Sequence, residues 1–220
     1  GLLHLWSPEL KRADFGHLPA EVMLAPFANH ALEAARRSDV IVAGPGLGRS
    51  PIARQELLRL VQAAPDKPWV MDADALFHLA DEPFDLPVNC VLTPHEGEAL
   101  RLIGEDPLIG GWGGDRLALV EALEARYQCL VLLKGAGNLA RISGSTYLVP
   151  GSARSLARGG SGDVLSGLIG ALVGRGATLE YAVHLGVRLQ LMAAQRFDAG
   201  QAETVTQQEI TQAITECWQE

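Results

Sequence analysis

Short uninterrupted apolar runs alternate with longer amphipathic stretches along the first 135 residues. The apolar runs are LLHLW (2–6), VIVAG (40–44), WVMDA (69–73), CVLTP (90–94) and LVLLKG (130–135). Between them, segments such as 29–38, 51–64 and 113–127 repeat apolar residues at spacings of three and four, the period of a helix. Non-alternating strands separated by helices predict an α/β fold, in which a mainly parallel sheet is covered by helices on both faces.

The rest of the chain predicts a hairpin followed by helices. LARIS and TYLVP flank Gly144-Ser145 and have the pattern of two strands joined by a tight turn. From there on, apolar periodicity predicts helices over 163–174, 179–197 and 206–218. Because no repeat, low-complexity tract or linker divides the sequence, we predict a single domain spanning residues 1–220.

Composition narrows the classes of partner. The chain has 220 residues, a formal net charge of −8 and no run rich in lysine or arginine, which argues against nucleic acid or an anionic membrane as a partner. Its three cysteines are far apart and form no C-x-x-C, so neither a disulfide framework nor a zinc site is suggested. No segment reaches the roughly 18 consecutive apolar residues of a membrane span. We expect a cytoplasmic protein.

Glycine-rich and polar tripeptides follow four of the predicted strands. In open parallel sheets, ligands bind outside the carboxyl ends of the strands, so these segments predict the rim of one site. Taken alone, GPGLGRS (44–50) matches neither G-x-G-x-x-G nor a Walker loop, and a plain strand-to-helix turn is the default interpretation of Gly46 and Gly48. His95 alone is as readily a structural or exposed histidine, and its position on the rim favours a functional role.

Two further segments have the character of anion sites. Lys134 ends an apolar strand, and Gly135 and Gly137 after it are expected to expose amides that suit a phosphate; the alternative is a surface lysine. In RGGSGDVLSGLIG, four small residues precede Asp163, where we expect a helix to begin and its first amides to converge on an anionic oxygen. The alternative is that Asp163 merely caps that helix, although a cap does not require four small residues before it.

Taken in order, GPGLG, DADAL, TPHEGE, LKGAGN and GGSGDVLSG make the chain resemble the ADP-dependent NAD(P)H-hydrate dehydratase family of the ribokinase-like superfamily. GGSGD is shared by the superfamily, whereas TPHEGE discriminates, because related small-molecule kinases tend to have Asn in place of His95. The resemblance implies a three-layer ribokinase-like fold. It also implies dehydration of hydrated NADH or NADPH (NADHX, NADPHX), with ADP or ATP as co-substrate, Mg²⁺ as cofactor, and AMP and phosphate as the products from ADP.

The resemblance also assigns roles to individual positions. It implies that Asp163 is catalytic, that the hydrate contacts Gly46, Gly48, His95 and Asp163, and that the nucleotide contacts Lys134, Gly135, Ala136, Gly137, Asn138 and Gly162. Because hydroxide is a poor leaving group, the ring hydroxyl would first be phosphorylated, with Asp163 accepting its proton and the amides after Gly162 stabilising charge. The helix N-terminus is expected to lower the pKa of Asp163. Asn138 stands where the family more often has Thr.

Several expectations concern the whole protein. The family pattern includes a further strand, a glycine-containing loop and a helix before the segment that matches GLLHLWSPE, and we expect these N-terminal parts to be absent from this chain. We also expect a homo-oligomer that works with an NAD(P)H-hydrate epimerase. Two alternatives stay open: a ribokinase-like kinase for a vitamin precursor or another small alcohol, and a catalytically inactive nucleotide-binding homologue.

Overall fold

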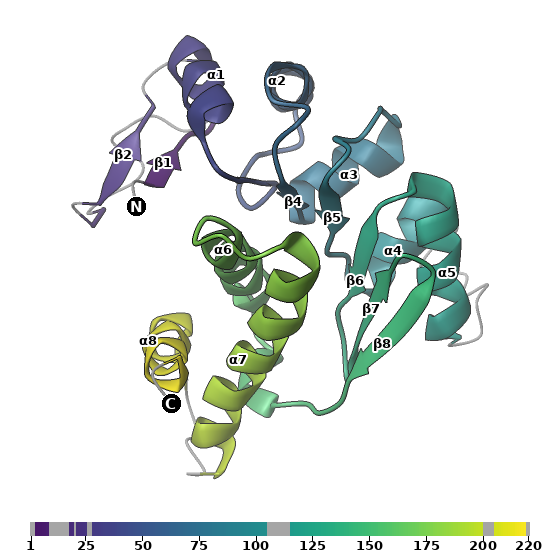
Figure 1. The fold of residues 1–220 in the computed structure, drawn as a ribbon, viewed down its shortest axis with the longest axis vertical. Coiled ribbons are helices and arrows are strands. Elements are labelled where there is room, and N and C mark those ends of the chain that lie inside the picture. Colours follow the sequence, from purple (N-terminus) through teal and green to yellow (C-terminus); the bar gives the residue numbers. More distant parts are fainter. Residues whose placement is uncertain are drawn as a thin grey trace.

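A six-stranded sheet forms the centre of the molecule (Figure 1). The computed structural model describes residues 3–8, 18–19, 21–25, 28–104, 115–199 and 205–218. In spatial order, the strands are β3 (Ile41–Ala43), β4 (Trp69–Met71), β5 (Cys90–Leu92), β6 (Leu130–Leu133), β7 (Asn138–Ile142) and β8 (Ser145–Val149). The first four pair in parallel, and the last two add an antiparallel hairpin. The predicted mainly parallel sheet is confirmed.

Helices cover both faces of this sheet. One layer contains α2 (Pro51–Ala63), α3 (Ala73–Asp81), α4 (Glu96–Ile103) and α5 (Arg116–Tyr127). The other layer contains α6 (Ser161–Val173) and α7 (Leu179–Ala199), and α8 (Gln207–Cys217) packs against α7. The 3-10 turn η2 (Arg154–Leu156) precedes α6 in the chain and also packs against α7. Side chains alternate along each strand, so Trp69 and Met71 join the first core while Val70 joins the second. This alternation gives the predicted three-layer architecture, with a helical layer on each face of the sheet.

The N-terminal part adds a small second sheet. β1 (Leu3–Leu5) pairs in parallel with β2 (Val22–Leu24), and α1 (Ala28–Arg37) then packs beside α2. Figure 1 shows this pair at the α1 side of the molecule, apart from the central sheet. The apolar run at 2–6 predicted β1, but β2 was not predicted, because its three residues show no strand pattern distinct from their neighbours.

Two of the shifted boundaries involve glycines with positive φ. The hairpin turns at Ser143 and Gly144, whose φ values of 48° and 81° are those of a type I′ turn, one residue before the predicted position. Helix α6 begins at Ser161 rather than at Asp163, with Gly160 as its N-cap at φ 87°. Asp163 is therefore the third residue of the helix.

In the part of the chain that the structure describes, no helix is both long and apolar enough to span a bilayer. All three cysteines are free thiols. Burial raises the pKa of the Cys129 thiol to about 12, and burial also raises that of Cys90.

Candidate active site

A buried carboxylate joins three elements at the carboxyl edge of the sheet. Asp72 directly follows β4 and is only 1% exposed. Its Oδ1 accepts a hydrogen bond from Lys134 Nζ at 2.6 Å, and its Oδ2 accepts one from Ser166 Oγ at 2.5 Å. Since an isolated buried charge is costly, the ammonium serves as its counter-ion. The ends of β4 and β6 are thereby fixed to the second turn of α6.

Lys134 is not a surface lysine. Its side chain is 17% exposed, and its Nζ lies against the beginning of α6, where a Cβ built on Gly162 would be 3.1 Å from it. The same Cβ would lie 3.5 Å from Asp72 Oδ2. A residue without a side chain at position 162 thus leaves the ammonium beside the first turn of the helix.

The N-terminus of α6 is available to an anion. Gly160 caps the helix without a side-chain hydrogen bond, so the interpretation of Asp163 as its N-cap is wrong. Among the described residues, the backbone N–H groups of Gly162 and Asp163 have no acceptor. Helix N-termini with free amides bind anionic oxygens, and Lys134 adds a positive charge at the same point.

Asp163 lies at this point with an altered acidity. Partial removal from water raises the pKa of its carboxyl, the nearby carboxylates of Asp72 and Asp74 raise it further, and Lys134 opposes them. The expectation that the helix N-terminus gives Asp163 a lowered pKa is therefore wrong. A carboxylate with a raised pKa accepts a proton more readily.

The loop from Lys134 to Asn138 is folded on itself. The Gly135 N–H donates to Asn138 Oδ1 at 3.2 Å, and the Gly137 N–H donates to the Gly151 carbonyl at 3.2 Å. The expectation that both amides are exposed beside the ammonium is therefore wrong in this structure. The Asn138 side chain therefore accepts a hydrogen bond from the backbone of its own loop.

Arg116, the first residue of α5, braces the same loop. Its Nη1 donates to the carbonyls of Ala136 at 2.9 Å and of Gly137 at 2.8 Å. A Cβ on Gly135, whose φ is 155°, would approach Arg116 Nη2 to 2.8 Å. The glycine and the arginine together set the path of the predicted nucleotide loop.

The glycine-rich segment after β3 is a strand-to-helix turn, and hydrogen bonds connect it to the segment that follows β4. Gly46 and Gly48 have φ values of 64° and 87°, a region that favours glycine. The Gly48 N–H donates to Asp74 Oδ2 at 3.1 Å, and the Gly48 carbonyl accepts from His78 Nε2 at 2.9 Å. Asp74 thus links the turn to the segment that carries Asp72.

His95 is both a helix cap and a rim residue. Its Nδ1 accepts from the Glu98 N–H at 3.3 Å, while Glu98 Oε2 accepts from the His95 N–H at 2.9 Å, which forms a capping box for α4. The imidazole is 60% exposed, and the His95 backbone pairs with Lys134. The structure therefore brings His95 beside the lysine without burying it.

The sequence prediction missed several residues of this site. Asp72 and Asp74 lie in DADAL at the end of a buried strand, a signal that could have identified them. Ala73 between them has φ 44°, a conformation that costs a residue with a Cβ roughly 1–2 kcal/mol and that no sequence pattern shows. Ser166 and Arg116 gave no signal, because their partners are distant in the sequence.

Comparison with known proteins decides the family. The family model described as NAD(P)H-hydrate dehydratase matches residues 1–216. The chain belongs to this family. Bifunctional NAD(P)H-hydrate repair enzymes are similar to it: that of Coxiella burnetii is 40% identical over 71% of this chain and 31% of the relative, and that of Thermosynechococcus vestitus is 39% identical over 85% and 34%. The chain thus spans about a third of the length of these relatives.

Solved structures share the fold. The ADP/ATP-dependent NAD(P)H-hydrate dehydratase of Bacillus subtilis, co-crystallised with ATP/Mg²⁺, has a TM-score of 0.74 at 24% identity, over 90% of this chain and 70% of the other. The hypothetical protein SMU.573 of Streptococcus mutans has a TM-score of 0.82 at 23% identity, over 94% and 75%. Hydroxyethylthiazole kinase of Pyrococcus horikoshii also matches, with a TM-score of 0.65 at 19% identity. At these identities the likeness establishes the fold and does not choose between dehydratase and kinase.

Proposed function

We propose that the chain dehydrates hydrated NADH or NADPH, with ADP or ATP as the phosphoryl donor. The observation that carries this proposal is the convergence, at the start of α6, of free amides, the Lys134 ammonium and the Asp163 carboxyl with its raised pKa. The first two suit a transferring phosphoryl group and the third suits an acceptor for a hydroxyl proton. Family membership supplies the substrate class.

The reaction balances in two steps. The ring hydroxyl oxygen bonds to the β-phosphorus of ADP while Asp163 accepts the hydroxyl proton, and the bond from that phosphorus to the bridging oxygen breaks to release AMP. The carbon–oxygen bond of the phosphorylated ring then breaks, phosphate leaves, and loss of a proton from the adjacent ring carbon restores the double bond. Phosphate is a much better leaving group than hydroxide.

The predicted contact residues stay part of this proposal, although the amides of Gly135 and Gly137 are bonded within the protein. On the hydrate side we place Gly46, Gly48, His95 and Asp163; on the nucleotide side we place Lys134, Gly135, Ala136, Gly137, Asn138 and Gly162. The described residues contain no group of three His, Cys, Asp or Glu side chains that could hold a metal ion. Mg²⁺ usually binds proteins through substrate phosphates and waters, so we place it on the nucleotide phosphates.

A spectroscopic assay tests the reaction. The chain is incubated with ADP and hydrated NADH, and the absorbance of reduced nicotinamide is followed. Recovery of that absorbance, dependent on ADP, is expected. ATP supplied with thiazole or pyrimidine alcohols tests the kinase alternative. Nucleotide binding without turnover in either assay would favour an inactive homologue.

We also propose properties of the whole protein. One ribokinase-like domain comprises residues 1–220, forms a homo-oligomer and functions in the cytoplasm together with an NAD(P)H-hydrate epimerase. The relatives' description as bifunctional repair enzymes, of which this chain matches about a third, supports the link to a second repair activity. Light scattering tests the oligomer. Faster consumption of a mixture of hydrate epimers when an epimerase is added tests the partnership.

A further inference from the structure

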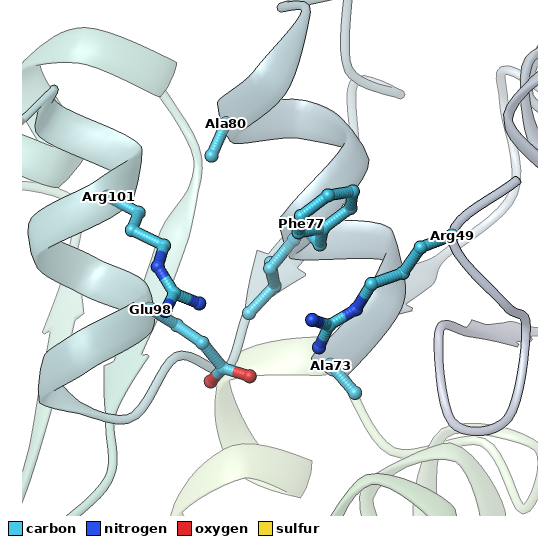
Figure 2. A pocket seen from close by; sticks show the side chains of 7 residues that line it. Arg49, Ala73, Phe77, Ala80, Glu98 and Arg101 are labelled. Carbon is cyan, nitrogen blue, oxygen red and sulfur yellow. The ribbon is translucent and has the colours of Figure 1, made fainter. Parts of the chain in front are cut away.

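A shallow pocket lies between α3 and α4, next to the residues placed on the hydrate side. Its walls include Arg49, Phe77, Glu98 and Arg101 (Figure 2). Figure 2 shows the two guanidinium groups directed into the same space from opposite sides. The nucleotide loop, by contrast, connects β6 to β7. The pocket is therefore a separate part of the rim, on the β4–β5 side.

Arg49 is fixed in place although its side chain is 58% exposed. Its Nε donates to Asp74 Oδ1 at 2.7 Å, and its guanidinium lies 4.6 Å from the centroid of the Phe77 ring. Exposed arginines ordinarily lose much side-chain entropy when they bind a ligand, and these two contacts have already restricted this one. Its Nη groups are left to face the pocket (Figure 2).

Arg101 completes the opposite wall from the last turn of α4. Within the described residues, its guanidinium makes no hydrogen bond or ion pair. The neighbouring Glu98 carboxylate is engaged by the His95 N–H. An alternative role for Arg101 is to interact favourably with the dipole at the C-terminal end of α4. That role would not explain why the restrained Arg49 lies opposite it.

We infer that Arg49 and Arg101 bind the diphosphate of the dinucleotide substrate. Guanidinium groups match phosphate oxygens with paired hydrogen bonds. Arg49 adjoins Gly48, and Arg101 follows Glu98, the partner of His95, by about one helical turn. In the hydrate, a single ribose separates the nicotinamide ring from the diphosphate, so a diphosphate subsite belongs beside the ring. This inference rests on the proposed substrate class.

Binding experiments test the subsite independently of turnover. Fluorescence titration with NADH, NADPH and dihydronicotinamide riboside, each with ADP at saturation, is carried out on the unchanged chain and on Arg49→Met and Arg101→Met. Each substitution is expected to weaken NADH and NADPH alike by about ten- to a hundredfold, the loss of a hydrogen bond to a charged group. Binding of the phosphate-free riboside should stay unchanged. Arg37→Met, on the exposed side of α1, is the matched control and should bind as the unchanged chain does.

The remaining outcomes separate the subsite from the proposed reaction. Loss of NADPH binding alone would overturn the diphosphate assignment in favour of the 2′-phosphate. The diphosphate assignment would also be overturned if the unchanged chain bound no detectable NADH. Equal weakening of NADH and riboside binding by the two substitutions would overturn it as well. In the dehydration assay, both substitutions should raise KM for the hydrate without lowering kcat. The expected binding pattern without any turnover would refute the reaction and leave the subsite standing.

Discussion

At the scale of single residues, the candidate site is built around a buried carboxylate, and one partner of that carboxylate also lies where we place the nucleotide. Asp72 is compensated by Lys134 and Ser166, and the same lysine lies beside the free amides of α6. Removing one member of a buried ion pair costs more than removing both, because a lone charge stays in a poorly hydrated environment. Under the proposed nucleotide binding, Lys134 would therefore couple binding to folding.

Lys134→Ala should weaken ADP binding by roughly 1–3 kcal/mol. It should also lower the free energy of unfolding by about 3–5 kcal/mol, because Asp72 loses its counter-ion. Calorimetry and urea denaturation measure the two effects. The double variant Asp72→Asn/Lys134→Ala should regain part of the stability but none of the ADP affinity, whereas Lys67→Ala serves as a control for both. Unchanged ADP affinity in Lys134→Ala would remove the lysine from the nucleotide site.

Asp163→Asn should abolish turnover while ADP affinity changes by no more than a few-fold. The substitution removes the proton acceptor but leaves the helix amides and Lys134 in place. Steady-state kinetics and calorimetry with ADP distinguish the two properties. Glu180→Gln, an exposed acidic residue in the first turn of α7, is the control. Near-normal turnover of Asp163→Asn would exclude Asp163 as the base.

The raised pKa of Asp163 also predicts a dependence of stability on pH. A carboxyl with a higher pKa in the folded state binds more protons when folded, so its contribution to stability falls as pH rises from the unfolded pKa through the folded one. Asp163→Asn should therefore have a higher Tm than the unchanged chain at neutral pH. The difference should vanish below the ordinary carboxyl pKa, about 3.9. Equal Tm values at neutral pH would contradict the raised pKa.

At the scale of elements, α6 has to approach the sheet closely while presenting its N-terminus to the site. Gly160 allows the positive φ at the cap, and Gln190 of α7 donates to the Ser161 carbonyl at 2.7 Å, which anchors the first turn. Further along, a Cβ on Gly170 would collide with Val42 of β3. The glycine is needed at the crossing of helix and strand.

Gly170→Ala should lower the free energy of unfolding by about 1–3 kcal/mol, the usual cost of overpacking. Gly167 lies in the same helix, and a Cβ there would meet no atom within 4 Å. Gly167→Ala should be neutral or stabilising, by up to about 1 kcal/mol, because alanine favours the helix. Chemical denaturation of both variants measures the difference. Equal effects would show that helix propensity, rather than contact with β3, dominates at Gly170.

At the scale of the molecule, the site is assembled from both sides of the sheet. Asp72 and Lys134 follow strands of the sheet, His95 caps a helix of one outer layer, and Asp163 belongs to a helix of the other. A ligand that binds these parts together stabilises the whole fold, since the unfolded chain has no such site.

ADP should therefore raise the Tm of the chain. At about a hundred times its Kd, a ligand that binds only the folded state adds about 2.7 kcal/mol of stability. Thermal denaturation with increasing ADP measures the shift, and adenosine at equal concentrations should give a smaller one because it lacks the phosphates that α6 and Lys134 would bind. Equal shifts with adenosine and ADP would contradict an anion site there.

Local chemistry explains what could be predicted from the sequence alone. Uninterrupted apolar runs predicted the strands of the parallel sheet, because a strand buried on both faces is apolar throughout. Apolar residues spaced three and four apart predicted several helices, because a helix buried on one side repeats with that period. The glycine and polar segments after those strands predicted the rim of the site, because the carboxyl ends of parallel strands meet at one edge. These properties belong to neighbouring residues.

Only the tertiary structure decided the features that depend on contacts between distant residues. The ion pair of Asp72 with Lys134 joins positions 62 residues apart, and the bond from Ser166 to Asp72 joins positions 94 apart. The raised pKa of Asp163 comes from its partial removal from water and from charges on other elements, and the internal bonds of the loop after Lys134 depend on Asn138 and on Gly151. The sequence determined which groups reach the rim, and packing decided which of them touch and what charge each one meets.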